Sequence, residues 1–279
     1  MAVKIVTDST SDLTPEIAGE LGIAVVPLYV HFGPEVYRDG VDLTTQDFYR
    51  KLAQNKELPT TAAPSPGDFV RFYDELAEET DEILTITISS KLSATYDAAV
   101  GGKELRNSKA RLEIIDSLSA ITGLGLITIS AAKVAQAGAD LDEVIDIARG
   151  CMRRVDFRMA FDTLEYLKRG GRIGTAQAFL GSALKLNPIL TIRDGATEGL
   201  TRVRSRAKAM DYLCEFAASF PRIEEMAIED ATTPDEAETL VERLGTSFAK
   251  ERIYRTKVSP VIGTHVGPHV LAVGILPRQ

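Results

Sequence analysis

Residues 82–105, EILTITISSKLSATYDAAVGGKEL, carry the pattern from which the fold class is inferred. Polar and apolar side chains alternate within residues 82–88, which are also rich in β-branched side chains, and this pattern indicates a strand. After a hydroxyl-rich loop, residues 93–105 are predicted to form a helix, and residues 111–115 another strand. A strand, a helix and a second strand in this order favour a parallel sheet with helices on its faces.

The chain on both sides of this unit continues the alternation. Residues 3–6 form a short apolar strand, and Thr14 with Pro15 marks the start of a helix that Gly22 ends. Residues 23–30 are apolar throughout and are predicted to be one strand with an irregularity at Pro27. Further helices are expected at 44–52, 65–78, 123–137 and 141–153, with a polar excursion at 33–40 and a loop at 55–64.

The pattern changes after residue 153. Strands are expected at 158–161, 188–192, 200–204, 224–228, 251–258 and 270–276, and helices at 164–168, 207–218 and 234–249. This half is expected to be α+β with more antiparallel pairing. The predicted fold is therefore α/β in two domains. An N-terminal domain, residues 1–153, has a mainly parallel sheet flanked by helices, and a C-terminal α+β domain, residues 154–279, has a mixed sheet.

Composition narrows the classes of function. A chain of 279 residues is long enough for two domains with their own cores. Its net charge of −8 argues against nucleic-acid binding, which needs a basic face. No apolar run approaches the ~20 residues of a spanning helix, and no signal peptide is recognised, so a cytoplasmic protein without stable membrane insertion is expected. Cys151 and Cys214 are far apart and are expected to be reduced core residues.

Several familiar chemistries have no matching motif. The chain contains no phosphate loop, no G-x-S-x-G elbow and no H-E-x-x-H pair, and its three histidines make a metal site unexpected. Gly123 and Gly125 lack the third glycine of a dinucleotide fingerprint, so helix packing is favoured. Asp8 after the first strand is faintly similar to the nucleophile of aspartate phosphatases, but Thr10 stands where those need a second Asp. A capping role for the Asp8 loop is therefore favoured.

Small hydroxyl side chains remain as candidates for an anion site. Ser93 is expected at the start of the helix 93–105, where its hydroxyl and the free first-turn amides would point at one place and the helix dipole favours negative charge. An ordinary N-cap is the competing interpretation. Thr61 lies in a second hydroxyl loop, which alone indicates only loop chemistry. His265 lies between two short apolar segments, where a structural histidine is the more common finding.

Motifs in a fixed order span the whole chain. They are VTDSTSDL (6–13), DGVD (39–42), Thr61 with Pro64 and Ser65, ISSKLSATY (88–96), LEYLKRGGRI (164–173), PIL (188–190), RSRAKA (204–209) and THVGP (264–268). Each motif is modest, but their order and spacing together are specific. In these motifs the chain resembles the DegV family, which includes the fatty-acid-binding subunits of bacterial fatty acid kinase.

The resemblance implies an α/β domain followed by an α+β domain, with a buried acyl chain whose carboxylate lies near the domain junction. Carried over by motif, the carboxylate contacts fall on Thr61, on the hydroxyl and amide of Ser93 and on the amide of Ala94. His265 is expected beside the carboxylate, serving a transfer step more than binding, and Arg172 is assigned to the same ligand site. No cofactor and no catalytic residue are expected in this interpretation.

Two departures from the family pattern involve three positions. Ala62 and Ala63 stand where the family often has polar residues, which leaves Thr61 intact but removes polar neighbours. His269 stands where a glycine usually follows the Gly-Pro pair. This change puts the local turn in doubt and would add a charge near the site at low pH.

Two classes of function remain open at this point. In the favoured one, the chain is a non-catalytic carrier that buries a long-chain fatty acid and presents its carboxylate to a separate, ATP-binding fatty acid kinase. In the other, the chain is a stand-alone hydrolase or phosphotransferase that uses Asp8, Ser93 or His265; a small-molecule sensor is a third interpretation.

Arginines gather locally although the chain is acidic. They are expected to dock the kinase partner, with a solvated strand end as the alternative. The predicted docking residues are Arg169, Arg202, Arg204 and Arg206.

Overall fold

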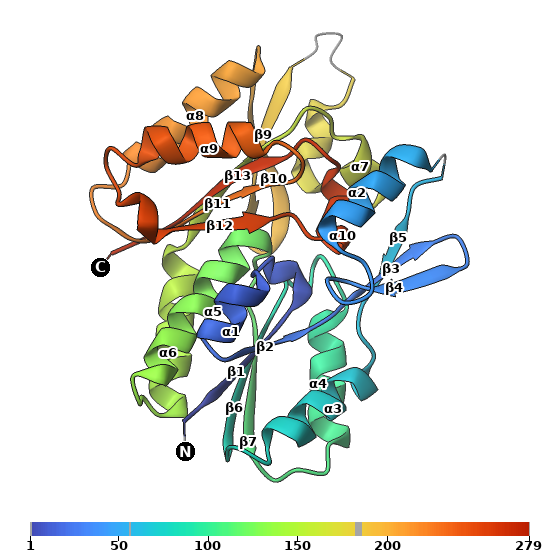
Figure 1. The fold of residues 1–279 in the computed structure, drawn as a ribbon, viewed down its shortest axis with the longest axis vertical. Helices are drawn as coiled ribbons and strands as arrows, with labels where there is room; N and C mark the ends of the chain where they lie inside the picture. The colour runs from blue at the N-terminus through green and yellow to red at the C-terminus, as the bar shows by residue number, and fades with distance from the viewer. Residues whose placement is uncertain (1, 56, 182–185, 279) are drawn as a thin grey trace.

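The computed structural model describes residues 2–55, 57–181 and 186–278. Its first layer is a four-stranded sheet in the order β2-β1-β6-β7, with all neighbours parallel. The strands are β1 (Lys4–Asp8), β2 (Ile23–Val26), β6 (Glu82–Thr87) and β7 (Arg111–Asp116). Helices α1 (Pro15–Glu20), α5 (Ile121–Gln136) and α6 (Leu141–Arg154) cover one face, and α3 (Pro66–Leu76) and α4 (Thr95–Leu105) cover the other (Figure 1).

The second half of the chain forms a six-stranded mixed sheet. Its order is β10-β9-β8-β13-β11-β12, and of these neighbours β11 and β12 run parallel while the other pairs are antiparallel. The strands are β8 (Asp156–Ala160), β9 (Asn187–Arg193), β10 (Ala196–Val203), β11 (Ile223–Asp230), β12 (Ile253–Lys257) and β13 (Leu271–Pro277). Helices α8 (Arg206–Ala218) and α9 (Pro234–Leu244) lie on one face (Figure 1). The expected fold class, a parallel sheet followed by a mixed sheet, is confirmed.

Helix α5 lies between the two sheets and packs on both. It is apolar or small around most of its circumference, as expected for a helix with no solvent face. A Cβ on Gly123 would come within 2.6 Å of the Phe157 ring, and one on Gly125 within 2.8 Å of the Ser11 carbonyl oxygen. The interpretation of these glycines as packing residues is confirmed. The buried core around α5 contains residues of both halves, so the sheets share one core.

A third sheet was missed by the sequence analysis. Strands β3 (Tyr29–Phe32), β4 (Glu35–Arg38) and β5 (Thr60–Ala62) pair antiparallel in the order β4-β3-β5. The expected single strand at 23–30 is wrong. Strand β2 ends at Val26, and the chain enters a different sheet as β3 at Tyr29. The excursion at 33–40 and the loop at 55–64 each contain a strand; Lys56 of that loop lies outside the described residues.

A short helix near the C-terminus was also missed. Helix α10 (Pro260–Val266) begins at the cap Ser259, whose hydroxyl accepts a hydrogen bond from the Ile262 amide at 3.4 Å. It packs against α2 (Thr45–Gln54), α7 (Glu165–Arg169), β3 and β5, and so ties the third sheet to the second half of the chain. Helix α9 ends at Leu244 rather than Ala249, and Gly245 is its C-cap residue.

Short 3-10 turns complete the described elements. They are η1 (Ser9–Ser11), η2 (Gly174–Phe179) and η3 (Lys250–Arg252). Among the residues that the structure describes, no helix is long and apolar enough to cross a membrane.

Candidate functional site

An inner cavity of about 190 Å³ lies where the three sheets meet. One buried water needs roughly 10–15 Å³ of such space, so the cavity of about 190 Å³ has room for roughly 13–19 groups of that size. Its apolar lining comes from every layer of the fold. These residues are Leu28, Ala62, Ala63, Ile88, Leu92, Ala120, Ile121, Met159, Phe161, Leu167, Ile192, Val261, Ile262 and Val266. The polar lining residues are Thr10, Thr61, Ser93, Arg172, Thr197 and His265, and Ala94 completes the lining.

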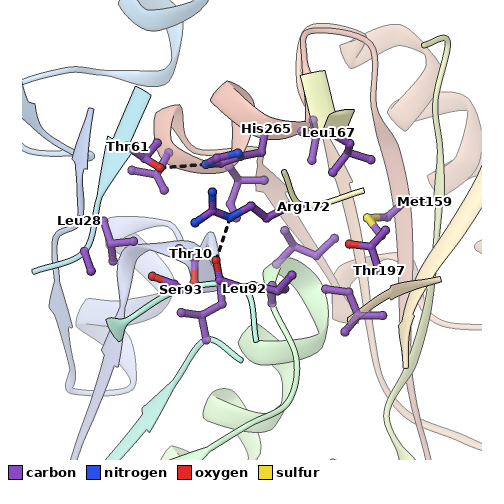
Figure 2. A pocket seen from close by; sticks show the side chains of 18 of the residues that line it. Thr10, Leu28, Thr61, Leu92, Ser93, Met159, Leu167, Arg172, Thr197 and His265 are labelled. Atoms are coloured by element: carbon purple, nitrogen blue, oxygen red, sulfur yellow. Dashed lines mark hydrogen bonds between the residues drawn. The ribbon is translucent and has the colours of Figure 1, made fainter. Parts of the chain in front are cut away.

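Thr61 and His265 meet at this cavity although 204 positions separate them in the sequence. Thr61 lies on β5 and His265 near the end of α10, and the Thr61 Oγ1 lies 2.8 Å from the His265 Nε2 (Figure 2). Burial, and next the positive charge of Arg172, lower the pKa of His265 to about 4. The imidazole is therefore neutral at neutral pH, and its Nδ1 has no hydrogen-bond partner within the described part of the chain.

The backbone of the glycine-rich turn shapes the other side of the imidazole. A Cβ on Gly170 would come within 2.2 Å of the His265 Nδ1, so a glycine is needed for this close approach. Arg172 follows in the same turn. Its Nε donates to the Leu92 carbonyl at 3.1 Å (Figure 2) and its Nη1 to the Gly170 carbonyl at 2.6 Å, and these two bonds hold the guanidinium beside the cavity.

Ser93 lines the cavity but does not cap the helix, so its expected position at the helix start is wrong. Helix α4 begins at Thr95, and its N-cap residue is Ala94, which supplies no side-chain cap. The Ser93 hydroxyl instead lies 2.8 Å from the Thr95 hydroxyl, and the Ser93 amide donates to the Ser89 carbonyl at 3.1 Å. The side chain of the N-cap residue therefore accepts no hydrogen bond from the first-turn amides of α4.

Asp8 is buried beneath the site and does not line the inner cavity. One carboxylate oxygen accepts from the Ile88 amide at 2.8 Å and the other from the Thr10 amide at 3.0 Å and from the Thr10 hydroxyl. Burial raises the pKa of Asp8 to about 6, although these donors oppose the rise. Asp8 thus fastens η1 to the end of β6, as the capping interpretation predicts, and positions Thr10 at the cavity.

Sequence reasoning missed part of the lining. Thr10 had a signal, since the loop after the first strand lies at the carboxyl edge of the sheet, where open α/β folds bind ligands. Met159, Phe161, Ile192 and Thr197 had none, because alternating strand residues look the same whether they face a core or a cavity.

An outer hollow of about 250 Å³ adjoins the polar end of the inner cavity. Thr61, Arg172 and His265 line both spaces, so these three side chains form the partition between them. Arg169 lines the outer hollow and is exposed, with its Nε donating to Glu165 at 2.6 Å.

The other predicted docking arginines lie away from both spaces. Arg202 and Arg204 are exposed, and the Arg202 guanidinium lies over the Phe179 ring at 5.1 Å from its centroid. Arg206 is half-buried and donates from Nε and Nη2 to the Glu236 carboxylate and from Nη1 to the His269 carbonyl. These contacts give Arg206 a structural role within its own half of the chain.

The two departures from the family pattern have different consequences. Ala62 and Ala63 line the inner cavity and extend its apolar wall. His269 is exposed and does not line the cavity, so the expected added charge near the site is wrong.

Comparison with known proteins agrees with this arrangement. The DegV family model, described as "Uncharacterised protein, DegV family", matches residues 2–278. A DegV domain-containing protein of Clostridium perfringens is 36% identical over 283 residues, covering 99% of this chain and 98% of that protein. A solved structure from Thermus thermophilus, described as fatty acid binding of a DegV family protein, superposes with a TM-score of 0.90 at 34% identity, covering 100% of both chains.

A second solved structure is described as DegV, a fatty acid binding protein from Bacillus subtilis. It has a TM-score of 0.87 at 29% identity and covers 99% of this chain and 99% of its own. The match of the family model over nearly the whole length, together with these relatives, is sufficient to assign the family. The chain belongs to the DegV family.

Proposed function

We propose that this protein binds a long-chain fatty acid in the inner cavity, with the carboxylate at the partition formed by Thr61, Arg172 and His265. The observation that carries this proposal is the distribution of polarity in the cavity. Apolar side chains from three sheets form most of the wall, while Thr61, Arg172 and His265 lie together at the end that meets the outer hollow. The fatty acids bound by the solved relatives support the same ligand class.

The head-group end suits an anion. Thr61 offers a hydroxyl, and the Ser93 hydroxyl can donate into the cavity while it accepts from the buried Thr95 hydroxyl. Ala94 lies at the uncapped start of α4, where backbone amides and the helix dipole favour a negative charge. Arg172 supplies the positive charge, and each charge-assisted bond contributes about 1.5–3 kcal/mol.

The tail end supplies most of the gross affinity. A C16 chain buries about 14 methylenes at roughly 0.8 kcal/mol each, which is about 11 kcal/mol before the costs of association and ordering. These costs amount to several kcal/mol, so a sub-micromolar dissociation constant is expected. The preference for long chains follows, because a short chain leaves much of the apolar wall without contacts.

We further propose that the protein is a carrier and not an enzyme. The outer hollow lies directly beyond the carboxylate end, so a separate ATP-binding kinase can reach the head group there without exposing the tail. His265 is neutral and stands at the partition, where it can stabilise charge during phosphoryl transfer. The proposed docking residues for the kinase are the exposed Arg169, Arg202 and Arg204. The proposed compartment is the cytoplasm. We also propose that the chain has two domains, residues 1–153 and 154–279, and that the ligand lies between them.

The stand-alone hydrolase has weaker support from the geometry. Asp8 does not line the cavity, and the Ser93 and His265 side chains each bond to a different threonine rather than to each other. A nucleophile and its base would be expected within hydrogen-bond reach.

Native mass spectrometry of freshly purified protein tests the proposal. The expected result is one retained long-chain fatty acid per chain and no turnover of acyl or phosphate esters. An empty protein that hydrolyses such esters would overturn it.

A further inference from the structure

Thr197 is a polar residue on the strand wall of the inner cavity. It lies on β10, is 5% exposed and pairs with Ile192 of β9. Directly opposite residues of an antiparallel pair lie on one face of the sheet. Because Ile192 also lines the inner cavity, the Thr197 side chain faces that space.

Thr197 is separated from the proposed position of the carboxylate. The three partition residues also line the outer hollow, whereas Thr197 does not. Figure 2 shows Thr197 and Met159 on the opposite side of the pocket from Thr61. Thr197 therefore faces the hydrocarbon chain of a bound fatty acid rather than its head group.

The Thr197 hydroxyl is the one cavity hydroxyl without a hydrogen bond within the described part of the chain. The other hydroxyls that line this space each bond to a neighbouring side chain; they belong to Thr10, Thr61 and Ser93. The position of Thr197 is fixed, because η2 packs directly on it: a Cβ on Gly174 would come within 2.0 Å of the Thr197 carbonyl oxygen. The branched Cβ of threonine also restricts its rotamers, so the free hydroxyl is held in the cavity wall.

A plain hydrocarbon chain does not satisfy this hydroxyl. Such a chain offers no hydrogen-bond partner, and it displaces the water that could supply one. Valine has nearly the same shape as threonine and also favours strands, so neither the packing nor the strand requires an oxygen atom at this position. A ligand that carries an oxygen atom on its chain would give the hydroxyl its missing partner.

We propose that Thr197 selects an oxygenated long-chain fatty acid, a hydroxy or oxo acid, by hydrogen-bonding the oxygen on its chain, a selectivity that rests on the proposed fatty acid binding in the inner cavity. A threonine hydroxyl donates to a keto oxygen and can donate to or accept from a hydroxyl, so both kinds of acid fit. A few polar groups in an otherwise apolar pocket fix the orientation of a ligand. Such a pocket discriminates against the analogue without the oxygen, because its own hydroxyl then stays unpaired.

Titration calorimetry on ligand-free protein tests this selectivity, with palmitate and with hexadecanoic acids hydroxylated at carbon 3, 10 or 16. At least one of the 10- and 16-hydroxy acids should bind more tightly than palmitate, because these hydroxyls lie away from the head group. In Thr197→Val, the affinity of that acid relative to palmitate should fall at least about tenfold, while palmitate binds as tightly as before or more tightly. The 3-hydroxy acid should keep its relative affinity, because its hydroxyl stays near the carboxylate.

Two further variants separate the effect of the hydroxyl from an effect on the fold. Thr197→Ser keeps the hydroxyl and should keep the preference, and Thr201→Val, on β10 but outside the inner cavity, should change no affinity. The proposal is overturned if no hydroxy acid binds more tightly than palmitate, or if Thr197→Val has the same relative affinities as the wild-type protein. In either case, tight binding of palmitate leaves the proposed function standing. Failure of the wild-type protein to bind any of the four acids would contradict both.

Discussion

The inner cavity and a second space of about 680 Å³ on the other side of η1, called here the acidic hollow because Asp12 and Asp39 line it, share the elements η1 and α10 but differ in their ionisable groups. Towards the inner cavity, η1 and α10 present Thr10 and His265, and Arg172 lines the same space. Towards the acidic hollow, the same segments present Ser9 and Ser259 beside the buried carboxylates Asp12 and Asp39. The overall charge of −8 therefore does not indicate which ionisable groups face either space.

Removing the hydroxyls of the inner cavity should have the largest effect. The double variant Thr61→Ala, Ser93→Ala loses two charge-assisted bonds of about 1.5–3 kcal/mol each, so palmitate affinity should fall at least about 100-fold. Fluorescence displacement or titration calorimetry would measure this. Ser90→Ala, in the same loop but outside the cavity, is the matched control. An unchanged affinity in the double variant would remove these hydroxyls from the head-group site.

The two spaces should also respond to pH in opposite directions. Burial raises the pKa of Asp39 from 3.8 to about 7, so the stability it contributes is fully present below pH 3.8 and is lost as pH rises through about 7. At about 1.36 kcal/mol per unit, the loss approaches about 4 kcal/mol. Asp39→Asn should therefore gain stability relative to wild type as pH rises from 4 to 8, measured by urea unfolding.

His265 should behave in the reverse sense. Its pKa is lowered from 6.5 to about 4, so the unfolded chain binds a proton that the native state does not between these values. Stability is lost as pH falls from 6.5 towards 4, by at most about 3 kcal/mol. In the His265→Gln variant, the free energy of unfolding should therefore depend less on pH between 6.5 and 4 than in the wild-type protein. Parallel pH profiles for the two variants would contradict the opposite character assigned to the two spaces.

A smaller effect is expected from crowding the imidazole. Gly170→Ala places a methyl group on the His265 ring and should displace it from Thr61, lowering palmitate affinity by about tenfold, or ~1.4 kcal/mol. Gly150→Ala is the control, because its nearest contact would be the flexible end of Arg153 at 4.0 Å. If Gly170→Ala binds palmitate as wild type does, the Thr61–His265 contact is not part of head-group binding.

The smallest effect is expected at the exposed arginines. Arg202→Ala with Arg204→Ala should leave palmitate affinity intact and raise the apparent KM of a partner kinase for this protein a few-fold, more at low ionic strength. Steady-state acyl phosphate formation at two salt concentrations would measure it. Equal kinetics at both salt concentrations would exclude a docking role for these residues.

Much of the fold was predictable because helices and strands with strong periodicity and clear caps follow from local sequence. The capping boxes at Ser65 and Asp140, for example, begin helices where expected. The third sheet was not predictable in the same way, since β4 and β5 are short and partly exposed, and their pairing with β3 depends on tertiary contacts. Helix α10 has seven residues, too few to show helical periodicity.

The candidate site was predictable in part, through motifs rather than geometry. Thr61, Ser93, Arg172 and His265 come from four distant segments, and the sequence alone offered no distance between any two of them. The motif order identified them, while the apolar lining and the acidic hollow required the structure. Asp39 and Asp12 lie in ordinary Asp-Gly and turn motifs, and their burial could not be inferred from residue type.

The central claim is that the inner cavity selects a long apolar chain ending in a carboxylate. Titration of ligand-free protein with palmitate, hexadecanol and octanoate tests this most directly. Palmitate should bind one per chain with sub-micromolar affinity, hexadecanol at least about tenfold more weakly because the head group loses its charge, and octanoate at least about 100-fold more weakly because about eight methylenes are missing. Equal affinity for palmitate and hexadecanol, or for palmitate and octanoate, would contradict the account.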